Sequence, residues 1–433
     1  MINLYLYNIM SNRFSPEKLR LICINLSDEI KKGDRFLNNK DVTIFNSSII
    51  EIDKSNNLLV ASRGFYGSVR SWDGVNFIIL SLFTDKLKKI RQNIVDIDPN
   101  IIQNKSLKFK ELKSKLIPHG ETMLDGPEDP RLFYHKGYIY IMVNELNKDK
   151  KRHMFISKVD LGTLSYTGKM ELCEPLSGSF EKNWGSFIHN KKLHMLYDIN
   201  PLKIFELDDN FKCKLKINVN DKILKKFGES YPDLHFHIRN STNLIDVGKN
   251  KFLGLGHGVL DYKDSTDINK YLIPSIDRSK YSESDKSYFK QFYKLYTGFF
   301  YTLDMNKKEI IEISPFFQLP NYESKQELIF FPTSIYLDKK KFVNISYNVG
   351  DNRSYFLRLH LDVINISLYD KKNVDFQVNH NINSNYYLEL IRSIRKIHGY
   401  PIERQEYYKF ADVNRILPTR KKSKKTKKKT KRR

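Results

Sequence analysis

The segment GYIYIMV, Gly137 to Val143, is a run of aromatic and β-branched residues that follows a Lys-Gly turn. A short run of this kind, bounded by turn residues, is typical of a buried β-strand. Helical periodicity is scarce elsewhere, so the sequence predicts an all-β fold. Similar runs recur along the chain: NLLVAS at 57–62, NFIILSL at 76–82, KLHMLY at 192–197, KFLGL at 251–255, YTGFFYTL at 296–303, KFVNISY at 341–347 and YFLRLHL at 355–361.

Several of these runs share a local pattern, in which a Gly, Asn or Lys turn precedes a strand of the form Lys-apolar-apolar. With ASRGFYGSVR near the start, five such units begin near residues 57, 137, 192, 250 and 340. Radial repeats of four-stranded blades have a period of about 40–50 residues, lengthened by insertions. We therefore expect a five-bladed β-propeller. A large β-sandwich and an irregular all-β domain are the alternatives.

The two ends of the chain differ from the repeated part. SNYYLELIRSIRK, Ser384 to Lys396, has apolar residues at helical spacing and predicts a C-terminal helix packed on the domain. Beyond Leu417 the chain is almost entirely Lys and Arg and has nothing to bury. The expected organisation is an N-terminal segment packed on the propeller at 1–50, the propeller at 51–380, a helical extension at 381–417 and a disordered Lys/Arg tail at 418–433.

Composition and charge limit the classes of function. Hydrophobic residues make up 40% and aromatic residues 13% of the 433, which is enough for a sizeable core and excludes global disorder. The net charge is +24, and residues 420–433 carry nearly half of it without any acid. This tail is predicted to bind a polyanion, either nucleic acid or an anionic membrane, or to act as a nuclear-localisation-type signal. A solvated tail without a partner is the alternative.

The number of cysteines and the hydropathy of the chain indicate the cellular compartment. Cys23, Cys173 and Cys213 are far apart in sequence and odd in number, which argues against a disulfide framework and a CxxC zinc site. No run approaches the length of a transmembrane helix, and the N-terminus lacks the pattern of a signal peptide. We expect a cytoplasmic protein without a transmembrane segment, with a nuclear location through the tail as an alternative.

The segment GPEDPRLF, Gly126 to Phe133, has the strongest chemical pattern in the chain. It places Glu128, Asp129 and Arg131 around a proline just before the strand at 137–143. A carboxyl there can exchange a proton or hydrogen-bond sugar hydroxyls, and an arginine can hold an anion or orient the acid. An acidic surface turn with a local salt bridge is the alternative interpretation.

Two later segments add polar residues before predicted strands. EKNWGSF contains Lys182, Asn183 and Trp184, which suit a sugar-stacking platform, although a tryptophan in the core is the alternative. The segment from His235 to Gly258 offers Arg239 and, after a strand, His257 as contacts for phosphate or sugar hydroxyls. The two histidines at 235 and 237 lack an evident third metal ligand, so ordinary polar contacts are favoured over a metal site.

The first and last units also carry candidates. ASRGFYGSVR supplies Arg63 and Arg70 in the first unit. FFPTSIYLDKKKFVNISYNVGD supplies Tyr347 and Asp351 in the last. The Gly-Asp pair at 350–351 is also compatible with a plain hairpin turn.

Taken in order, PEDPRLF, EKNW, RNST, LGLGH and FFPTS…SYNVGD resemble the motifs of one family. The family is the five-bladed β-propeller group of β-mannoside phosphorylases and related β-1,2-mannosyltransferases, and the match spans about residues 57–361. The resemblance implies a glycosyl-transferring site at the mouth of the central channel. Phosphate would attack the anomeric carbon with inversion, and the reverse reaction would use a sugar phosphate or nucleotide sugar as donor.

The resemblance also implies residue roles, with Asp129 as the general acid that protonates the glycosidic oxygen. No metal or cofactor is implied, only phosphate or a sugar phosphate as co-substrate. The implied substrate contacts are Glu128, Arg131, Asn183, Trp184, Tyr347 and Asp351. The implied phosphate contacts are Arg63, Arg70, Lys182, Arg239 and His257.

Two departures from the family pattern affect these expectations. The Arg-Gly-Gly-Thr-like segment is Arg239-Asn240-Ser241-Thr242 here, without the glycines that allow close backbone approach. No second acid is evident to activate water, which favours phosphate or transferase chemistry over hydrolysis. The alternatives are a non-catalytic propeller that binds glycan or protein, and a nucleic-acid-associated protein acting through its tail.

Overall fold

A computed structural model describes ten stretches of the chain: residues 14–52, 56–68, 73–97, 126–147, 151–172, 182–229, 234–262, 294–317, 329–372 and 386–399. Two predictions fall outside these stretches. They are the phosphate contact by Arg70 and the Lys/Arg tail at 418–433.

Two of the sheets in the described part are simple antiparallel runs of four strands, each strand paired with the next along the chain. We call the first unit 2: β6 (Glu128–His135), β7 (Tyr138–Leu146), β8 (Arg152–Asp160) and β9 (Ser165–Glu171). We call the second unit 3: β10 (Gly185–His189), β11 (Lys192–Ile199), β12 (Leu202–Leu207) and β13 (Cys213–Val219).

The sheet that follows unit 3 in the chain, unit 4, is larger. Its strand order is β14-β16-β17-β18-β22, and β15 pairs with β16 beside β14. Its strands are β14 (Leu234–Asn240), β15 (Ile245–Gly248), β16 (Lys251–Tyr262), β17 (Lys294–Asp304), β18 (Glu309–Ile313) and β22 (Tyr369–Asp370), and the helix α5 (Lys222–Glu229) precedes it.

The eight-stranded sheet joins the first and last parts of the chain. Unit 1 is β2 (Val42–Glu51), β3 (Leu58–Ser68), β4 (Asp73–Phe83) and β5 (Lys89–Val95), and unit 5 is β19 (Phe330–Leu337), β20 (Phe342–Val349) and β21 (Arg353–His360). The two units meet at one parallel bridge, between Ile44 and Arg353. The N-terminal strand β1 (Ile22–Asn25) pairs antiparallel with β21 and supplies the fourth strand of unit 5.

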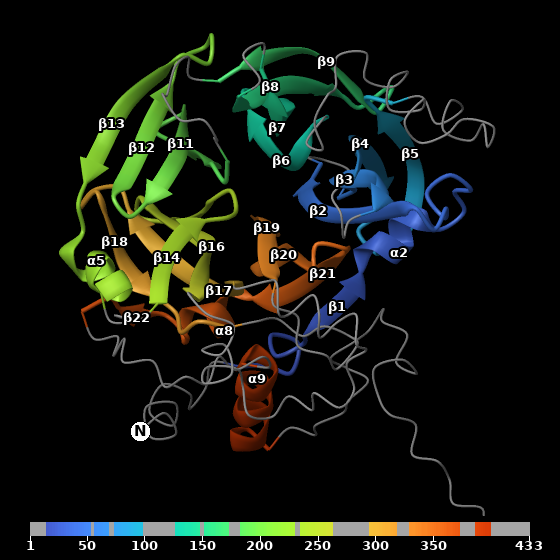
Figure 1. Ribbon diagram of the computed structural model, residues 1–433. Helices are drawn as coiled ribbons and strands as arrows, with labels where there is room; N and C mark the ends of the chain where they lie inside the picture. Colours follow the sequence, from blue (N-terminus) through green and yellow to red (C-terminus); the bar gives the residue numbers. More distant parts are fainter. Residues whose placement is uncertain are drawn as a thin grey trace, which may run out of the picture.

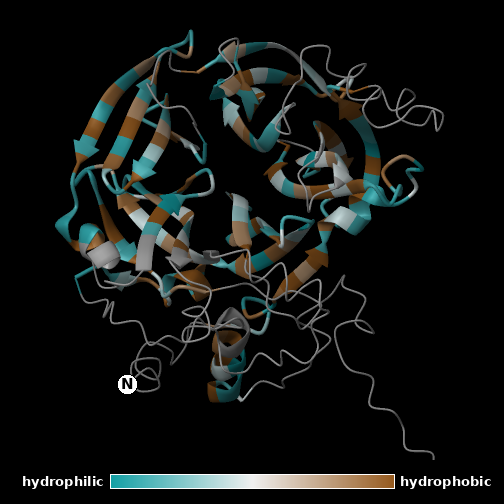
Figure 2. Ribbon diagram, viewed as in Figure 1, coloured by the Kyte–Doolittle hydropathy of each residue, from teal (hydrophilic) through white to brown (hydrophobic). Residues whose placement is uncertain are grey.

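The sheets are arranged around a common centre like the blades of a propeller (Figure 1). The first strands of neighbouring units, β2, β6 and β19, contact one another near this centre. Hydrophobic and hydrophilic residues alternate along many strands (Figure 2), as expected where one sheet face packs on its neighbour. The predicted all-β class is confirmed. The described part of the chain forms four sheets, and the eight-stranded one consists of two units that meet at a single parallel bridge. Counting these two units separately gives the predicted five blades.

Hydrophobic clusters lie between consecutive units of the described chain and hold the ring together. Between units 2 and 3, for example, Phe133 and Met142 pack with Trp184 and Phe205. Each buried side chain of this size stabilises the fold by about 1.5–3 kcal/mol. Unit 2, for example, has apolar side chains on both faces, because Leu132 and Ile141 pack with unit 1 while Phe133 and Met142 pack with unit 3.

The ring closes between units 5 and 1 through buried hydroxyl groups. Ser47 Oγ lies 2.7 Å from Ser62 Oγ, and Ser354 Oγ accepts a hydrogen bond from the Ser47 amide at 3.1 Å. Ser334 Oγ accepts from the amide of Ile49 at 2.8 Å. These contacts lie at the irregular part of β2 between Phe45 and Ser48, and they hold the backbone that follows Asn46.

Helices are short and lie outside the ring of sheets. α2 (Leu26–Lys31) follows β1, and α8 (Leu361–Asn365) follows β21. α9 (Tyr386–Ile397) forms where the sequence predicts a C-terminal helix. Its Leu390, Ile391 and Ile394 are buried in the cluster that also contains residues of units 4 and 5.

Two further observations bear on the expected compartment. Cys213 is disulfide-bonded, although the number and spacing of the cysteines argued against a disulfide framework. Cys23 is free and buried. In the described part of the chain, none of the helices is long and apolar enough to cross a membrane.

Candidate active site

A cavity of about 410 Å³ lies where the units converge. Its wall is polar and charged, and all five units contribute to it. The lining residues are Asn46 and Arg63 from unit 1; Glu128, Asp129, Asn144 and Arg152 from unit 2; Lys182 and Asn183 just before unit 3; His237, Arg239, His257, Val259 and Tyr296 from unit 4; and Ile329, Phe331 and Asp351 from unit 5.

Most of the residues predicted from the motifs therefore meet at one place, although they come from sequence positions up to 288 residues apart (351 − 63). They are Arg63, Glu128, Asp129, Lys182, Asn183, Arg239, His257 and Asp351.

The backbone at Asp129 is turned by an irregularity in β6. The register of β6 against β7 shifts between Glu128 and Arg131, and Asp129 has a φ of 50°. Only a few per cent of non-glycine residues adopt this left-handed conformation. Asn46, Asn183 and Asp351, all in the same cavity wall, also have φ between 49° and 67°. Unfavourable backbone conformations gathered at one cavity are typical of functional sites.

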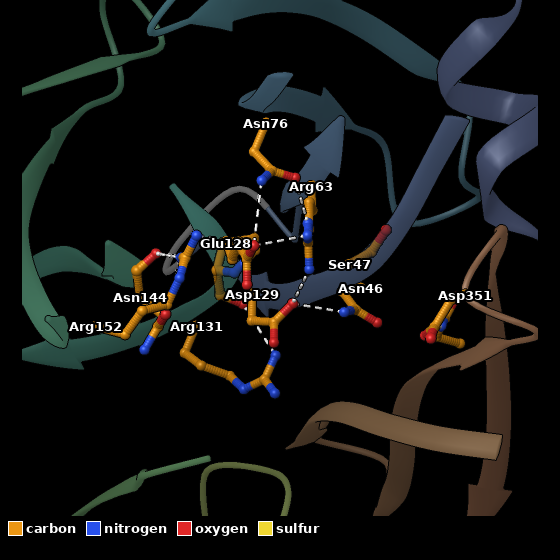
Figure 3. Close-up of polar contacts among 12 residues, drawn as sticks. Asn46, Ser47, Arg63, Asn76, Glu128, Asp129, Arg131, Asn144, Arg152 and Asp351 are labelled. Carbon is orange, nitrogen blue, oxygen red and sulfur yellow. Dashed lines mark hydrogen bonds and ion pairs between the residues drawn. The ribbon is translucent and has the colours of Figure 1, made fainter. Parts of the chain in front are cut away.

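The carboxylate of Asp129 is held by two donors on one oxygen (Figure 3). Asn46 Nδ2 donates to Oδ1 at 2.6 Å, and Arg63 Nη1 donates to the same oxygen at 3.2 Å. Burial by itself raises the pKa of Asp129. Arg63, Arg131, the hydrogen bond from Asn46 and Lys182 outweigh burial and bring that pKa below its ordinary value. Asp129 is thus a carboxylate at neutral pH in the ligand-free protein.

Glu128 lies beside Asp129 and receives three donors on one oxygen. Arg63 Nη2 is 2.9 Å from Oε1, Arg152 Nη2 is 3.1 Å away, and Asn76 Nδ2 donates at 3.2 Å (Figure 3). Arg152 also donates to Asn144 Oδ1 at 3.0 Å. Charged and amide side chains of units 1 and 2 are thereby linked in one network at the cavity wall.

The part of the wall from units 3 and 4 is basic. Lys182 and Arg239 line it together with His237 and His257. Burial lowers the pKa of His257 far below its ordinary value, and the nearby Arg239 and His237 lower it further. Ser241 Oγ lies 2.6 Å from His257 Nδ1 and fixes the orientation of the ring. A neutral imidazole among cations leaves this part of the cavity suited to an anion.

An aromatic surface adjoins the basic part. The ring of His257 stacks on Tyr296 at 5.9 Å between centroids and lies 4.8 Å from Phe331. Tyr296 and Phe331 line the cavity with Val259 and Ile329. These apolar groups suit the C–H face of a sugar.

Asp351 lines the same cavity as Glu128 and Asp129, although the sequence showed no second acid placed to activate water. It comes from the turn between β20 and β21, and Asn348 Nδ2 donates to its Oδ1 at 2.9 Å. Burial raises its pKa to about 6, with an additional contribution from the charge of Asp129 and an opposing one from Arg63. The pKa values of the two aspartates in the cavity are thus shifted in opposite directions.

Replacing Asp351 with asparagine is expected to stabilise the protein above pH 6. The raised pKa means that the folded state binds the proton more tightly than the unfolded chain, so the free energy of unfolding falls as the pH rises from about 4 to about 6. Asparagine is permanently neutral and tolerates the same backbone conformation. Urea unfolding at pH 4 and pH 7.5 measures this, and a stabilisation equal at both pH values would contradict it.

Two predicted contacts, Trp184 and Tyr347, lie in the core and do not line the cavity. Trp184 is 2% exposed and packs in the core, with its ring 5.3 Å from Tyr197 and 6.4 Å from Phe205. Tyr347 is fully buried, stacks on Tyr355 at 5.5 Å, and its hydroxyl lies 3.3 Å from Cys23 Sγ. Both are core residues, because they point into the clusters between units and away from the centre.

Arg131 takes an intermediate position. It is 3% exposed, lies 6.0 Å from the centre of the Phe331 ring, and is not among the residues that line the cavity. Burial lowers its pKa to about 10, against the opposing effect of Asp129. Its influence on the site is electrostatic, because its charge lowers the pKa values of both Asp129 and His257.

Sequence reasoning missed several cavity residues, chiefly Asn46, Asn144, Arg152, Tyr296 and Phe331. Phe331 stands in the FFPTS motif but was not singled out there, and nothing in the sequence distinguishes the other four from ordinary strand residues. In the described stretches, no group of three or more His, Cys, Asp or Glu side chains is placed to hold a metal ion.

Comparison with known proteins gives only distant similarities. No protein-family model and no curated protein matches the chain. A phosphate-bound mannose phosphorylase from Leishmania mexicana has a TM-score of 0.42 and 12% identity, covering 74% of this chain and 85% of that one. A GDP-Man-dependent mannosyltransferase from the same organism has a TM-score of 0.45 and 11% identity, covering 74% and 86%. β-1,2-Mannobiose phosphorylase from Listeria innocua has a TM-score of 0.45 and 11% identity, covering 76% and 94%.

Proposed function

We propose that this protein is a five-bladed β-propeller enzyme that transfers a glycosyl group between phosphate and a hydroxyl acceptor, with inversion. One observation carries the proposal: a single cavity combines an ionised carboxylate, Asp129, with a basic surface that includes Lys182 and Arg239. The carboxylate can take a proton from a hydroxyl, and the basic surface can hold a phosphate group. A mannosyl-like sugar is the substrate suggested by the sequence motifs.

The ionised form of Asp129 is the form that the synthetic direction requires. A carboxylate accepts the proton of the acceptor hydroxyl while the acceptor oxygen bonds to the anomeric carbon. The bond between that carbon and the phosphate oxygen breaks, and phosphate leaves with the electron pair toward Lys182 and Arg239. Phosphorolysis is the reverse, in which a protonated Asp129 acts as the general acid expected from the sequence.

Phosphate as leaving group and nucleophile fits the charge of the cavity. The basic residues of units 3 and 4 compensate a dianion, and His257 can become protonated when an anion cancels the surrounding positive charge. Asp351, with a pKa of about 6, is placed to hydrogen-bond sugar hydroxyls as either donor or acceptor near neutral pH. No metal or cofactor is required by this chemistry.

A donor screen tests the proposal. Purified protein is incubated with sugar 1-phosphates and nucleotide sugars plus mixed acceptors, and in the reverse direction with β-mannosides plus inorganic phosphate. Release of phosphate or nucleotide, with a new glycoside detected by mass spectrometry, is the expected result. Tight binding of a glycan without turnover of any donor would instead favour a non-catalytic glycan-binding propeller. The nucleic-acid alternative rests on residues 420–433, which lie outside the described stretches.

A further inference from the structure

Glu128 has a feature that the proposed reaction does not use. Its Oε1 accepts from three donors on three different strands: Arg63 on β3, Asn76 on β4 and Arg152 on β8. The side chains of Arg63, Arg152 and Glu128 are 6%, 5% and 13% exposed. Three donors exhaust the lone pairs of one carboxylate oxygen, so substrate contact would have to use the other oxygen.

The guanidinium of Arg63 is fixed on three sides. Its Nε donates to Asn76 Oδ1 at 2.8 Å, its Nη2 contacts Glu128, and its Nη1 donates to Asp129. Asn76 in turn donates to Glu128, which closes a ring of polar contacts (Figure 3). The direction in which Nη1 points toward Asp129 is thus set by the other two contacts, because a guanidinium is planar and rigid.

The charges in this network are balanced. Two guanidinium groups, Arg63 and Arg152, face two carboxylates, Glu128 and Asp129. Buried charges of this kind are tolerated only when they are paired. If a neutral residue replaced Glu128, Asp129 would be the only carboxylate left in this network to balance two guanidinium groups. Arg63 and Arg152 would then repel each other, because no negative charge would lie between them.

We infer that Glu128 is a positioning residue. It holds Arg63 in the orientation in which Nη1 donates to Asp129, and by pairing with Arg152 it prevents the charge of Arg152 from displacing Arg63. This role differs from the substrate contact predicted from the sequence, and its effect on turnover rests on the proposed function. The two neighbouring acids of the motif therefore have different roles. Asp129 exchanges a proton with the reacting hydroxyl, and Glu128 orients Arg63 and Arg152.

A double-mutant cycle tests this inference, with Glu128→Gln, Arg152→Gln and the two combined. Glu128→Gln is expected to lower kcat roughly 10²-fold, as misplacement of a catalytic group does, while leaving the donor KM little changed. It should also melt at a lower temperature than wild type. The combined variant restores the charge balance and should melt above Glu128→Gln and recover part of kcat. Glu206→Gln is a matched control, because Glu206 contacts Lys192 and Lys216 away from the cavity.

The outcomes separate this inference from the proposed function. A rise in donor KM with unchanged kcat in Glu128→Gln would identify Glu128 as a substrate contact and overturn the inference. The inference would also be overturned if the effects of the two substitutions on the melting temperature were additive. Absence of turnover by wild type would contradict the proposed function, whereas non-additive melting temperatures would still support the positioning of Arg63 by Glu128.

Discussion

Replacing Asp129 with asparagine is expected to lower kcat/KM for glycosyl transfer by roughly 10³-fold, within the range for loss of a general acid or base. Asparagine keeps an oxygen for the donors Asn46 and Arg63 but cannot accept the proton of the acceptor hydroxyl. The fold should be retained, because both neighbouring donors still have a partner. Initial rates over a range of donor concentrations measure the effect, and circular dichroism verifies the fold.

Asp246→Asn provides the matched control for this variant. Asp246 is exposed on β15, outside the cavity, and an asparagine there can still accept from the amide of Gly248. Its kcat/KM should equal that of wild type. If Asp129→Asn kept more than a small fraction of the wild-type rate, Asp129 would not be the base. Because the pKa of Asp129 is depressed, we expect this group to stay ionised down to about pH 4, the ordinary range of an aspartate, and a change in the synthetic rate near pH 6 to come from Asp351.

Replacing Trp184 with alanine is expected to reduce the free energy of unfolding by about 3–5 kcal/mol, as for other buried aromatic residues. The structure places this indole between units 2 and 3, where it packs with Phe133, Phe205 and Met195. A sugar-stacking residue would behave differently, because its loss would weaken ligand binding and leave stability nearly unchanged. Urea denaturation together with a ligand-binding assay separates the two roles.

Phe331→Ala is the complementary variant. Phe331 lines the cavity and packs beside His257, so its truncation should weaken sugar binding more than it affects stability. If Trp184→Ala unfolded at the same urea concentration as wild type but bound sugar poorly, the core assignment of Trp184 would be wrong.

The strands and the grouping of the motif residues were accessible from the sequence. Short apolar runs with turn residues at their ends indicated the sheets, and the motifs at the start of inner strands indicated where polar groups collect. Asp129 and Asn183 are examples, because each stands next to the beginning of the first strand of its unit. Which residues stand at the start of a strand depends on the neighbouring sequence, so short sequence patterns are enough to predict it.

The direction of individual side chains was not accessible. Trp184 stands beside Asn183, yet the indole points into the core while Asn183, whose φ is 67°, lines the cavity. The contact between Asn46 and Asp129 joins residues 83 positions apart, and it depends on irregularities in two different strands. Bulges of this kind shift the alternation of side chains without a clear sequence signal.

The electrostatic differences within the site were also hidden. Asp129 and Asp351 are chemically identical, and their pKa values differ in direction because Asn46 and Arg63 donate to Asp129, whereas Asp351 receives one hydrogen bond from Asn348. The sequence shows two aspartates in loops. Only the fold shows which of them is surrounded by cations.

The most direct test of a sugar-phosphate site in the central cavity is calorimetric titration of the protein with α-mannose 1-phosphate, inorganic phosphate and mannose. Arg239→Gln serves as the variant, because Arg239 lies in the basic part of the wall. We expect wild type to bind the sugar phosphate more tightly than either fragment, and Arg239→Gln to lose affinity for both phosphate-containing ligands but not for mannose. Equal affinity of the variant and wild type for the sugar phosphate would contradict the placement of phosphate in this cavity.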